Sequence, residues 1–254
     1  MMCSKHTWRA LLLTVTMLVC VSAARADEPV QQPVSPYRFR WTLDAPIVSL
    51  GVAGTLGYLV EPRPPACAAS PQACPAPDNL PGFDRGALGL YSRPALTVGN
   101  IMIGALLLGP HLANVVGTRA EGAAWIEDAA ITAESVLVAQ ALTQAMKAAT
   151  DRYAPLMYNP DSDLSARYSP DASRSFWSGH TATAFAAATS FATSYWLRHP
   201  RSPWRWVVLA TVESAALWAG LLKIRAGYHW PTDIAAGAAA GIGVGIMIPA
   251  LHMP

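Results

Sequence analysis

Charged side chains are scarce in this chain: they make up 13% of its 254 residues, against 52% hydrophobic residues. Soluble domains usually carry about 25% charged residues, so much of the chain is deeply buried or in contact with lipid. The formal net charge is only +2, and no basic stripe with interleaved aromatic residues is present. The sequence therefore predicts one large domain and no nucleic-acid partner.

The N-terminus lacks an apolar run long enough for an ordinary membrane span, which needs about 20 residues. A basic start, an apolar core over residues 10–21 and Ala24-Arg25-Ala26 are instead typical of an export signal. Cleavage before Asp27 is favoured over an uncleaved anchor helix. The expected segments are a signal peptide (1–26), an arm with a short apolar helix and a Pro/Cys loop (27–94), and a main domain (95–250).

Cysteine is rare as well, with four residues in the chain. Signal cleavage would remove Cys3 and Cys20 and leave Cys67 and Cys74 in a stretch dense in proline and alanine. Two cysteines in an exported loop predict one disulfide, with two free thiols as the alternative. A metal site is less expected because no histidine lies near them, and no cluster with metal-ligand spacing occurs elsewhere. The sequence therefore predicts no metal and no other cofactor.

Strand signals are few after residue 94, where alanine dominates and favours helices. The prediction is an all-α bundle of about five to six helices, embedded in a membrane, with the active site at helix ends on one face. A glycine every fourth residue, at Gly237, Gly241 and Gly245, permits close contact between two helices. The five main helices are expected over residues 95–116, 129–149, 181–197, 206–222 and 233–248.

Membrane placement rests on two further features. Glu134 and Glu213 lie inside expected helices, and intramembrane charge usually faces the bundle interior. The loop over residues 198–205 is short and strongly basic, as cytoplasmic loops are, which places residues 150–180 and 223–233 together on the outer face. The favoured location is the bacterial inner membrane with a periplasm-facing site, and a soluble periplasmic protein is the alternative.

Three clusters of reactive side chains lie at helix ends. Ser178, Gly179 and His180 open one helix, whose free N–H groups and dipole favour an anion, and His180 can protonate a leaving group. An ordinary N-cap is the alternative. His229 and Asp233 stand beside another helix start, where a carboxylate bonded to one ring nitrogen leaves the other free to attack. A surface histidine near a capping aspartate is the alternative there.

The third cluster contains Lys147 near a helix end, where a basic residue is by itself an ordinary C-cap. Together, the clusters resemble the type-2 phosphatidic acid phosphatase family, whose active site is shared with bacterial acid phosphatases and vanadium haloperoxidases. The family pattern is K-x6-R-P, then P-S-G-H, then S-R-x5-H-x3-D, and the resemblance covers roughly residues 95–250. It implies that His229 attacks phosphorus, His180 protonates the leaving alcohol and Asp233 orients His229, without a metal.

Four positions depart from that pattern: Ala154, Trp177, Leu222 and Lys223. Ala154 lacks a bidentate donor, and Lys223 replaces a planar fork with a point charge. A charged contact is worth about 1.5–3 kcal/mol, so turnover is expected to fall by a decade or more unless Arg152 or Arg225 enters the site. The expected phosphate ligands are Lys147, Arg152, Ser178, Gly179, Lys223 and Arg225.

The predicted function is hydrolysis of a phosphomonoester or pyrophosphate of a lipid or isoprenoid through a phosphohistidine. A soluble, non-specific acid phosphatase acting on small phosphate esters is one alternative, and a vanadium haloperoxidase is disfavoured because the chain is short. A degenerate protein that only binds phosphorylated lipid is supported by Ala154 and Lys223. The intact pair of His229 and Asp233 opposes it, because a mere binder needs no nucleophile.

Overall fold

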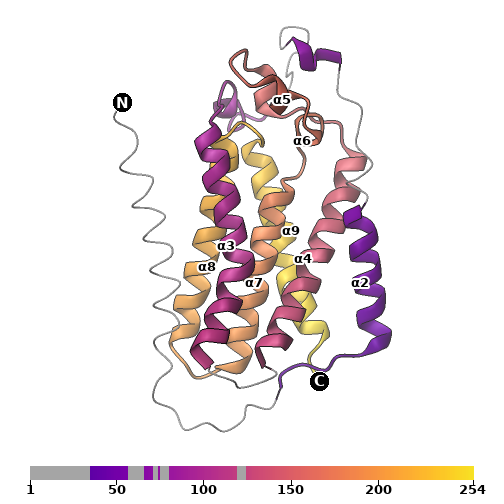
Figure 1. Cartoon of the computed structure of the whole chain (residues 1–254), viewed down its shortest axis with the longest axis vertical. Helices are drawn as coiled ribbons and strands as arrows, with labels where there is room; N and C mark the ends of the chain where they lie inside the picture. The colour runs from indigo at the N-terminus through magenta and orange to yellow at the C-terminus, as the bar shows by residue number, and fades with distance from the viewer. Residues whose placement is uncertain (1–34, 57–65, 71–73, 75–79, 119–123) are drawn as a thin grey trace.

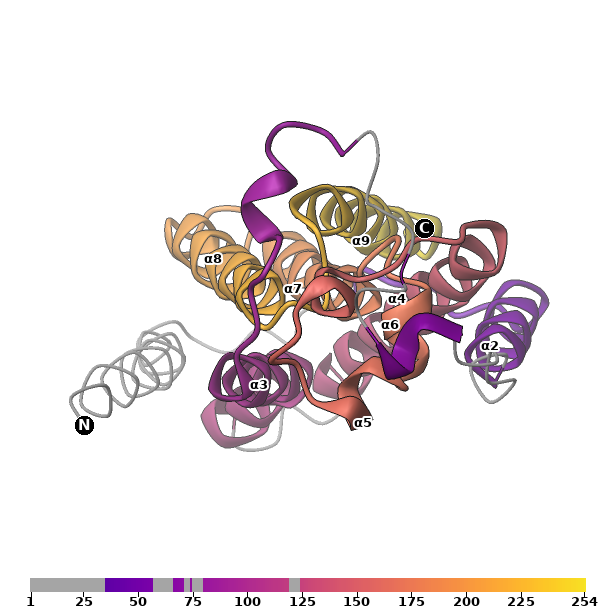
Figure 2. The same cartoon turned by 90° about the horizontal axis from the view of Figure 1, so that it is seen from above.

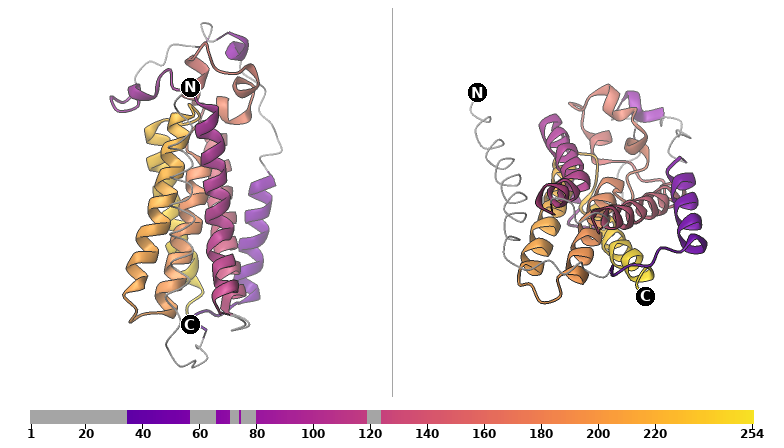
Figure 3. Two further views of the ribbon diagram at one scale, coloured as in Figure 1. Left: turned by 60° about the vertical axis from the view of Figure 1, so that its left-hand side comes forward. Right: turned by 60° about the horizontal axis from the view of Figure 1, so that its bottom comes forward.

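The computed structural model describes residues 35–56, 66–70, 74, 80–118 and 124–254, and every regular element in these ranges is helical. The expected signal peptide and the arm up to residue 34 lie outside the described residues. Long helices stand side by side as a bundle (Figures 1 and 3). They are α2 (Trp41–Leu56), α3 (Arg93–Thr118), α4 (Ala124–Ala149), α7 (Gly179–Arg198), α8 (Trp204–Arg225) and α9 (Pro231–Leu251).

Short helices gather at one end of the bundle, around the labels α5 and α6 in Figure 1. They are η2 (Ala66–Ala69), η4 (Arg85–Ala87), η5 (Pro155–Tyr158), α5 (Leu164–Arg167) and α6 (Pro170–Ser173). The all-helical prediction is confirmed, and each of the five predicted main helices is present with somewhat wider bounds. The short apolar helix expected in the arm corresponds to α2, of which the structure describes residues up to Leu56.

Helix α7 runs through the middle of the bundle, between α4, α8 and α9 (Figure 2). Its alanine-rich sequence leaves little side-chain bulk, so its neighbours approach closely, and the tightest approach is to α9. A Cβ atom on Gly241 would lie 2.4 Å from the carbonyl oxygen of Ala182, and one on Gly237 would lie 2.6 Å from that of Ser178. The predicted glycine contact between helices is therefore confirmed, and it sets the spacing of the two helices that carry the histidines.

In the part of the chain that the structure describes, three helices are long and apolar enough to cross a membrane: α8, α9 and residues Arg93–Asn114 of α3. The polar groups of the bundle turn inward, as predicted for intramembrane carboxylates. Glu213 of α8 accepts a hydrogen bond of 2.6 Å from the hydroxyl of Thr189 in α7. Glu134 of α4 is buried, with 5% of its surface exposed. The outer faces of the three apolar helices are therefore left for lipid.

The helix alternation brings the three reactive clusters to one end. The loop after α4, the start of α7 and the turn from α8 to α9 all lie beneath the short helices, whereas the α7–α8 loop and the C-terminus lie at the opposite end (Figure 1). Cys74, near this upper end, is disulfide-bonded. The side chain of its expected partner, Cys67, lies outside the described residues, so the pairing stays a prediction.

Candidate active site

His229 is placed by the sharp turn between α8 and α9. Gly227 makes that turn in the left-handed region, with φ of +81°, and a Cβ there would lie 2.2 Å from the carbonyl oxygen of Leu90. Only glycine fits both conditions. Pro231 then starts α9 with its φ already suited to a helix. His229 is thus fixed between two rigid helices and is completely buried.

The ring of His229 is held in one tautomer by a backbone carbonyl. Its Nδ1 lies 2.9 Å from the carbonyl oxygen of Ser175, which can only accept, so Nδ1 carries the proton and donates it. The opposite nitrogen, Nε2, then has a free lone pair. It is buried and has no hydrogen-bond partner among the described residues. A buried imidazole nitrogen in this state is suited to nucleophilic attack.

Asp233 stands beside the same ring but does not make that hydrogen bond. Its Oδ2 is 3.7 Å from Nδ1 of His229, beyond hydrogen-bonding distance. The same oxygen accepts the backbone N–H of Trp230 at 2.9 Å and so caps the first turn of α9. The sequence assigned the orienting bond to Asp233. In the structure the carbonyl of Ser175 makes it, and Asp233 contributes negative charge next to a ring that becomes positive when it is protonated.

Arg152 lies between two buried carboxylates. Its guanidinium donates to Asp233 Oδ1, to the hydroxyl of Thr232 at 2.7 Å and to Asp84 Oδ2 at 2.6 Å. Asp84 also accepts the backbone N–H of Thr232 at 2.9 Å. Arg152 thus reaches the vicinity of His229 through Asp233, while its N–H groups are directed at carboxylates. Arg225, the other candidate, is exposed at the end of α8.

Two lysines bring positive charge into the site from different helices. Lys147, in the last turn of α4, donates to Asp171 Oδ1 at 3.0 Å and to the carbonyl of Arg174. Lys223 of α8 is fully buried and donates to Asn100 Oδ1 on α3. Within the described residues, neither ammonium group donates a hydrogen bond to a carbonyl of its own helix. Lys147 therefore does not act as the C-cap that the alternative interpretation expected.

Asp171 of α6 stands among these groups. Burial would raise the pKa of its carboxyl, but the charges of Lys147, His229 and His180 outweigh burial and hold that pKa well below its usual range. Burial and the positive charges of Lys223, His229 and Lys147 lower the pKa of His180 to about 3, against the opposing charge of Asp171. A carboxylate therefore occupies the centre of the positive site, where an anionic substrate group would bind.

The start of α7 has the contacts of an ordinary N-cap, which was the alternative interpretation of its sequence, and the anion site there stays a prediction. Ser178 caps the helix, since its Oγ accepts the backbone N–H of Thr181 at 3.3 Å and the hydroxyl of the same residue at 2.9 Å. A Cβ on Gly179 would meet Thr143 Cγ2 at 2.9 Å, so this glycine also lets α4 approach. Trp177, which replaces the proline of the family pattern, donates from Nε1 to the Thr143 hydroxyl at 2.8 Å and ties the loop to α4.

Sequence reasoning missed two contributors to the site. Asp84 is an isolated aspartate in a loop rich in glycine and proline, and no local spacing connects it to Arg152. Ser175 acts through its backbone carbonyl, which has no side-chain signature. Ala154, where the family carries an arginine, is completely buried, and its N–H donates to the carbonyl of Ala172 at 2.9 Å.

Two histidines, two buried lysines and a helix N-terminus thus lie at one end of the helical bundle. Residues 128–253, about half of the chain, match the family model described as PAP2 superfamily. The chain is a member of this superfamily.

Three relatives can be compared in detail. Over 81 residues the chain is 47% identical to the lipid A 1-phosphatase of Porphyromonas gingivalis, a match that covers 31% of this chain and only 17% of that protein. The crystal structure of Aquifex aeolicus LpxE is 18% identical, with 93% of this chain and 94% of that chain covered and a TM-score of 0.38. A PAP2-type phosphatidylglycerolphosphate phosphatase of Bacillus subtilis is 14% identical, with 96% and 94% covered and a TM-score of 0.40. Family membership rests on residues 128–253.

Proposed function

We propose that this chain hydrolyses the phosphomonoester or pyrophosphate of a membrane lipid through a phosphohistidine intermediate. The observation that carries the proposal is the buried Nε2 of His229, which has no partner among the described residues while Nδ1–H is held by Ser175. A histidine that only supported the fold would be expected to satisfy both nitrogens. Here the free nitrogen belongs to a ring that, like Lys147, interacts electrostatically with both Asp171 and His180.

The reaction divides into two displacements at phosphorus. The negative charge of the bound phosphate raises the pKa of His180 and favours its protonated form. His229 Nε2 attacks, the bond between phosphorus and the leaving oxygen breaks, and His180 gives that oxygen a proton. Water then attacks the phosphohistidine, His180 takes the proton from the water, and inorganic phosphate leaves while Nε2 recovers its lone pair. Charge on the phosphoryl oxygens is stabilised by Lys147, Lys223 and the N–H groups at the start of α7.

A lipid substrate is supported by the placement of the site. It lies at the end of α8 and α9, two helices apolar enough to cross a membrane, so a substrate held in the bilayer presents its head group at this level. The lipid A 1-phosphatase that matches 81 residues acts on a lipid phosphate. Arg167, above the site on α5, is buried and its Nε and one terminal nitrogen have no partner among the described residues, which suits contact with a second anionic group.

We also propose that the site faces the periplasm from the inner membrane. The basic loop between α7 and α8 lies at the opposite end of the bundle. Part of its charge is neutralised inside the protein, because Arg198 pairs with Glu127 at 2.8 Å and with Asp128 at 2.9 Å. Arg201 is exposed and stays available to mark the cytoplasmic side. Phosphate release from intact cells by an impermeant substrate tests this orientation.

The function is tested by phosphate release from full-length protein in detergent. The panel contains lipid A, phosphatidic acid, phosphatidylglycerol phosphate, a polyprenyl pyrophosphate and a soluble phosphomonoester. His229→Ala is expected to abolish release, whereas His199→Ala, at the opposite end of the bundle, is expected to leave it unchanged. With ³²P-labelled substrate, wild type should form an acid-labile covalent label that His229→Ala does not form. Activity that survives His229→Ala overturns the mechanism, and lipid binding without turnover by wild type favours the non-catalytic alternative.

A further inference from the structure

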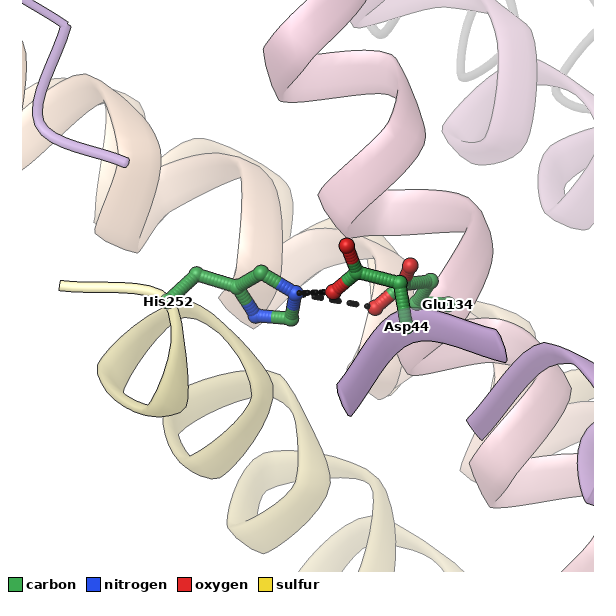
Figure 4. A group of neighbouring side chains, drawn as sticks. All are labelled: Asp44, Glu134 and His252. Atoms are coloured by element: carbon green, nitrogen blue, oxygen red, sulfur yellow. Dashed lines mark hydrogen bonds and ion pairs between the residues drawn. The ribbon is translucent and has the colours of Figure 1, made fainter. Parts of the chain in front are cut away.

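A second cluster of ionisable groups lies at the end of the bundle opposite the phosphate site. Asp44 comes from the first turn of α2, Glu134 from α4 and His252 from the end of α9, and their polar atoms converge (Figure 4). Nε2 of His252 is 2.8 Å from Asp44 Oδ1 and 3.3 Å from Glu134 Oε2. Helix α9 alone separates this cluster from His229 by about 30 Å, so the cluster has no part in the proposed hydrolysis.

The orientation of the imidazole directs one nitrogen at both carboxylates. Nδ1 of His252 lies 2.8 Å from the carbonyl oxygen of Ile248, so it carries a proton and donates it. Such a bond from the distal nitrogen is what fixes the tautomer of a histidine that binds metal through its other nitrogen. His252 is completely buried, and the side chain of Asp44 is 17% exposed.

Glu134 adds an independent observation. Its Oε2 is buried and has no hydrogen-bond partner among the described residues, although it points at His252 Nε2. With both carboxyl groups ionised, even a protonated imidazole would leave the cluster with one excess negative charge. Buried charge without compensation is strongly unfavourable. A divalent cation with a neutral imidazole would bring the total to zero and give Oε2 a partner.

We propose that Asp44, Glu134 and His252 bind a divalent transition-metal ion, with Zn²⁺ as the best fit. Tetrahedral zinc with bonds of about 2.0–2.1 Å holds its ligand atoms about 3.3–3.4 Å apart. The distance from Nε2 to Glu134 Oε2 is 3.3 Å, and all three ligand atoms lie within 4.8 Å of one another. The 2.8 Å contact with Asp44 must open by about half an ångström to reach this spacing. A nitrogen ligand beside two carboxylates favours zinc over magnesium or calcium, which prefer all-oxygen sites.

The ion would link the segment that leads into α2 to the C-terminal end of α9. The segment before α2 already lies against the C-terminus of α9. The N–H of Arg38 donates to the carbonyl of His252 at 2.7 Å, and the ring centroids of Phe39 and His252 are 5.5 Å apart. Coordination would join α2, α4 and α9 at one point. This role is structural and is independent of the proposed function at the other end.

The test uses full-length protein in detergent, stripped with EDTA and titrated with Zn²⁺ in competition with a chromophoric chelator. Wild type is expected to bind one zinc ion per chain, and Glu134→Gln, which keeps the size of the side chain, is expected to bind it at least tenfold more weakly. Glu213→Gln, a carboxylate of another helix, is the matched control and should bind like wild type. His252→Ala should abolish binding but removes a buried ring, so the conclusion rests on Glu134→Gln.

Thermal unfolding gives a readout that does not depend on the chelator. EDTA should lower the Tm of wild type and of Glu213→Gln, and it should leave the Tm of Glu134→Gln unchanged. No stoichiometric zinc on wild type, or equal affinity in wild type and Glu134→Gln, overturns the proposal. A wild-type Tm that is insensitive to EDTA also overturns it and identifies the cluster as a proton-bridged group of three side chains.

Discussion

The carboxylate of Asp171 and the phosphate of a substrate compete for the same lysine if the proposed site is correct. Lys147 donates to Asp171 at 3.0 Å and to the carbonyl of Arg174, which leaves one of its three N–H donors for a phosphoryl oxygen. The negative charge of Asp171 beside that ammonium repels the phosphate and competes with it for the positive charge of Lys147. We therefore predict that Asp171→Asn strengthens the binding of phosphate. The change keeps the shape of the side chain and removes only its charge.

The magnitude follows from the burial of the pair. The side chains of Lys147 and Asp171 are 8% and 16% exposed, so solvent screens their contact weakly. A hydrogen bond to a charged group contributes about 1.5–3 kcal/mol, and about 1.4 kcal/mol is tenfold in affinity. Because asparagine still accepts a weaker bond from Lys147, we expect the lower part of this range. The inhibition constant of phosphate or vanadate should fall about 10- to 30-fold.

Competitive inhibition of the hydrolase activity by orthovanadate and by inorganic phosphate measures the effect. Asp161→Asn is the matched control, because Asp161 is exposed in the same loop, and it should leave both inhibition constants unchanged. An inhibition constant that rises or stays the same in Asp171→Asn would refute the competition and make Asp171 a structural partner of Lys147.

Acid cannot take the place of this substitution. The pKa of Asp171 is lowered by Lys147, His229 and His180 despite burial. Because its pKa is lowered, the carboxylate stays charged as the pH falls through about 4, the ordinary pKa of aspartate. The ion pair therefore stabilises the fold above that pH and is lost only at still lower pH. Assays at about pH 5 should show the full difference between wild type and Asp171→Asn.

Two predictions concern the frame that holds His229. Arg152→Lys cannot bridge Asp84 and Asp233 and should lower the free energy of unfolding by about 2–4 kcal/mol, less than a fully buried pair because the arginine is 23% exposed. An unchanged Tm in detergent would contradict this. Gly241→Ala places a Cβ 2.4 Å from the α7 backbone and should lower the free energy of unfolding by about 1–3 kcal/mol. The control Gly243→Ala meets no atom within 4 Å and should leave the stability unchanged or slightly higher. Equal Tm values for the two variants would refute the tight contact.

The sequence predicted the parts of this molecule that depend on local pattern. The long helices follow from alanine-rich apolar runs, and the glycines of α9 predicted a close neighbour. The helix alternation also brought Lys147, His180 and His229 to one end, as expected. These inferences need only spacing along the chain and the rule that consecutive helices reverse direction.

Contacts between segments far apart in the sequence escaped prediction for a physical reason. Spacing within one helix does not say which helix lies beside it, so neither Asp84 beside Arg152 nor Asp44 beside His252 has a signature. Asp44, Glu134 and His252 have no metal-ligand spacing in the sequence, because each of them comes from a different helix. The carbonyl of Ser175 was missed because any residue could supply it.

The cationic side chains proposed to surround His229 are fewer than the family pattern implies. The charge of these groups explains how the proposed site can still favour a transition state. The cations Lys147, Lys223 and Arg152 equal in number the carboxylates Asp171, Asp84 and Asp233, so the resting site has a net charge of about zero, which poorly matches a phosphate dianion. Transfer of Lys147 from Asp171 to a phosphoryl oxygen raises the charge that faces the substrate. If that transfer is completed only as negative charge develops, the interaction is stronger in the transition state than in the bound substrate, which is the condition for catalysis. The loss of the arginine at Ala154 would then weaken ground-state binding more than turnover, and a substrate anchored in the membrane needs little affinity from the site itself.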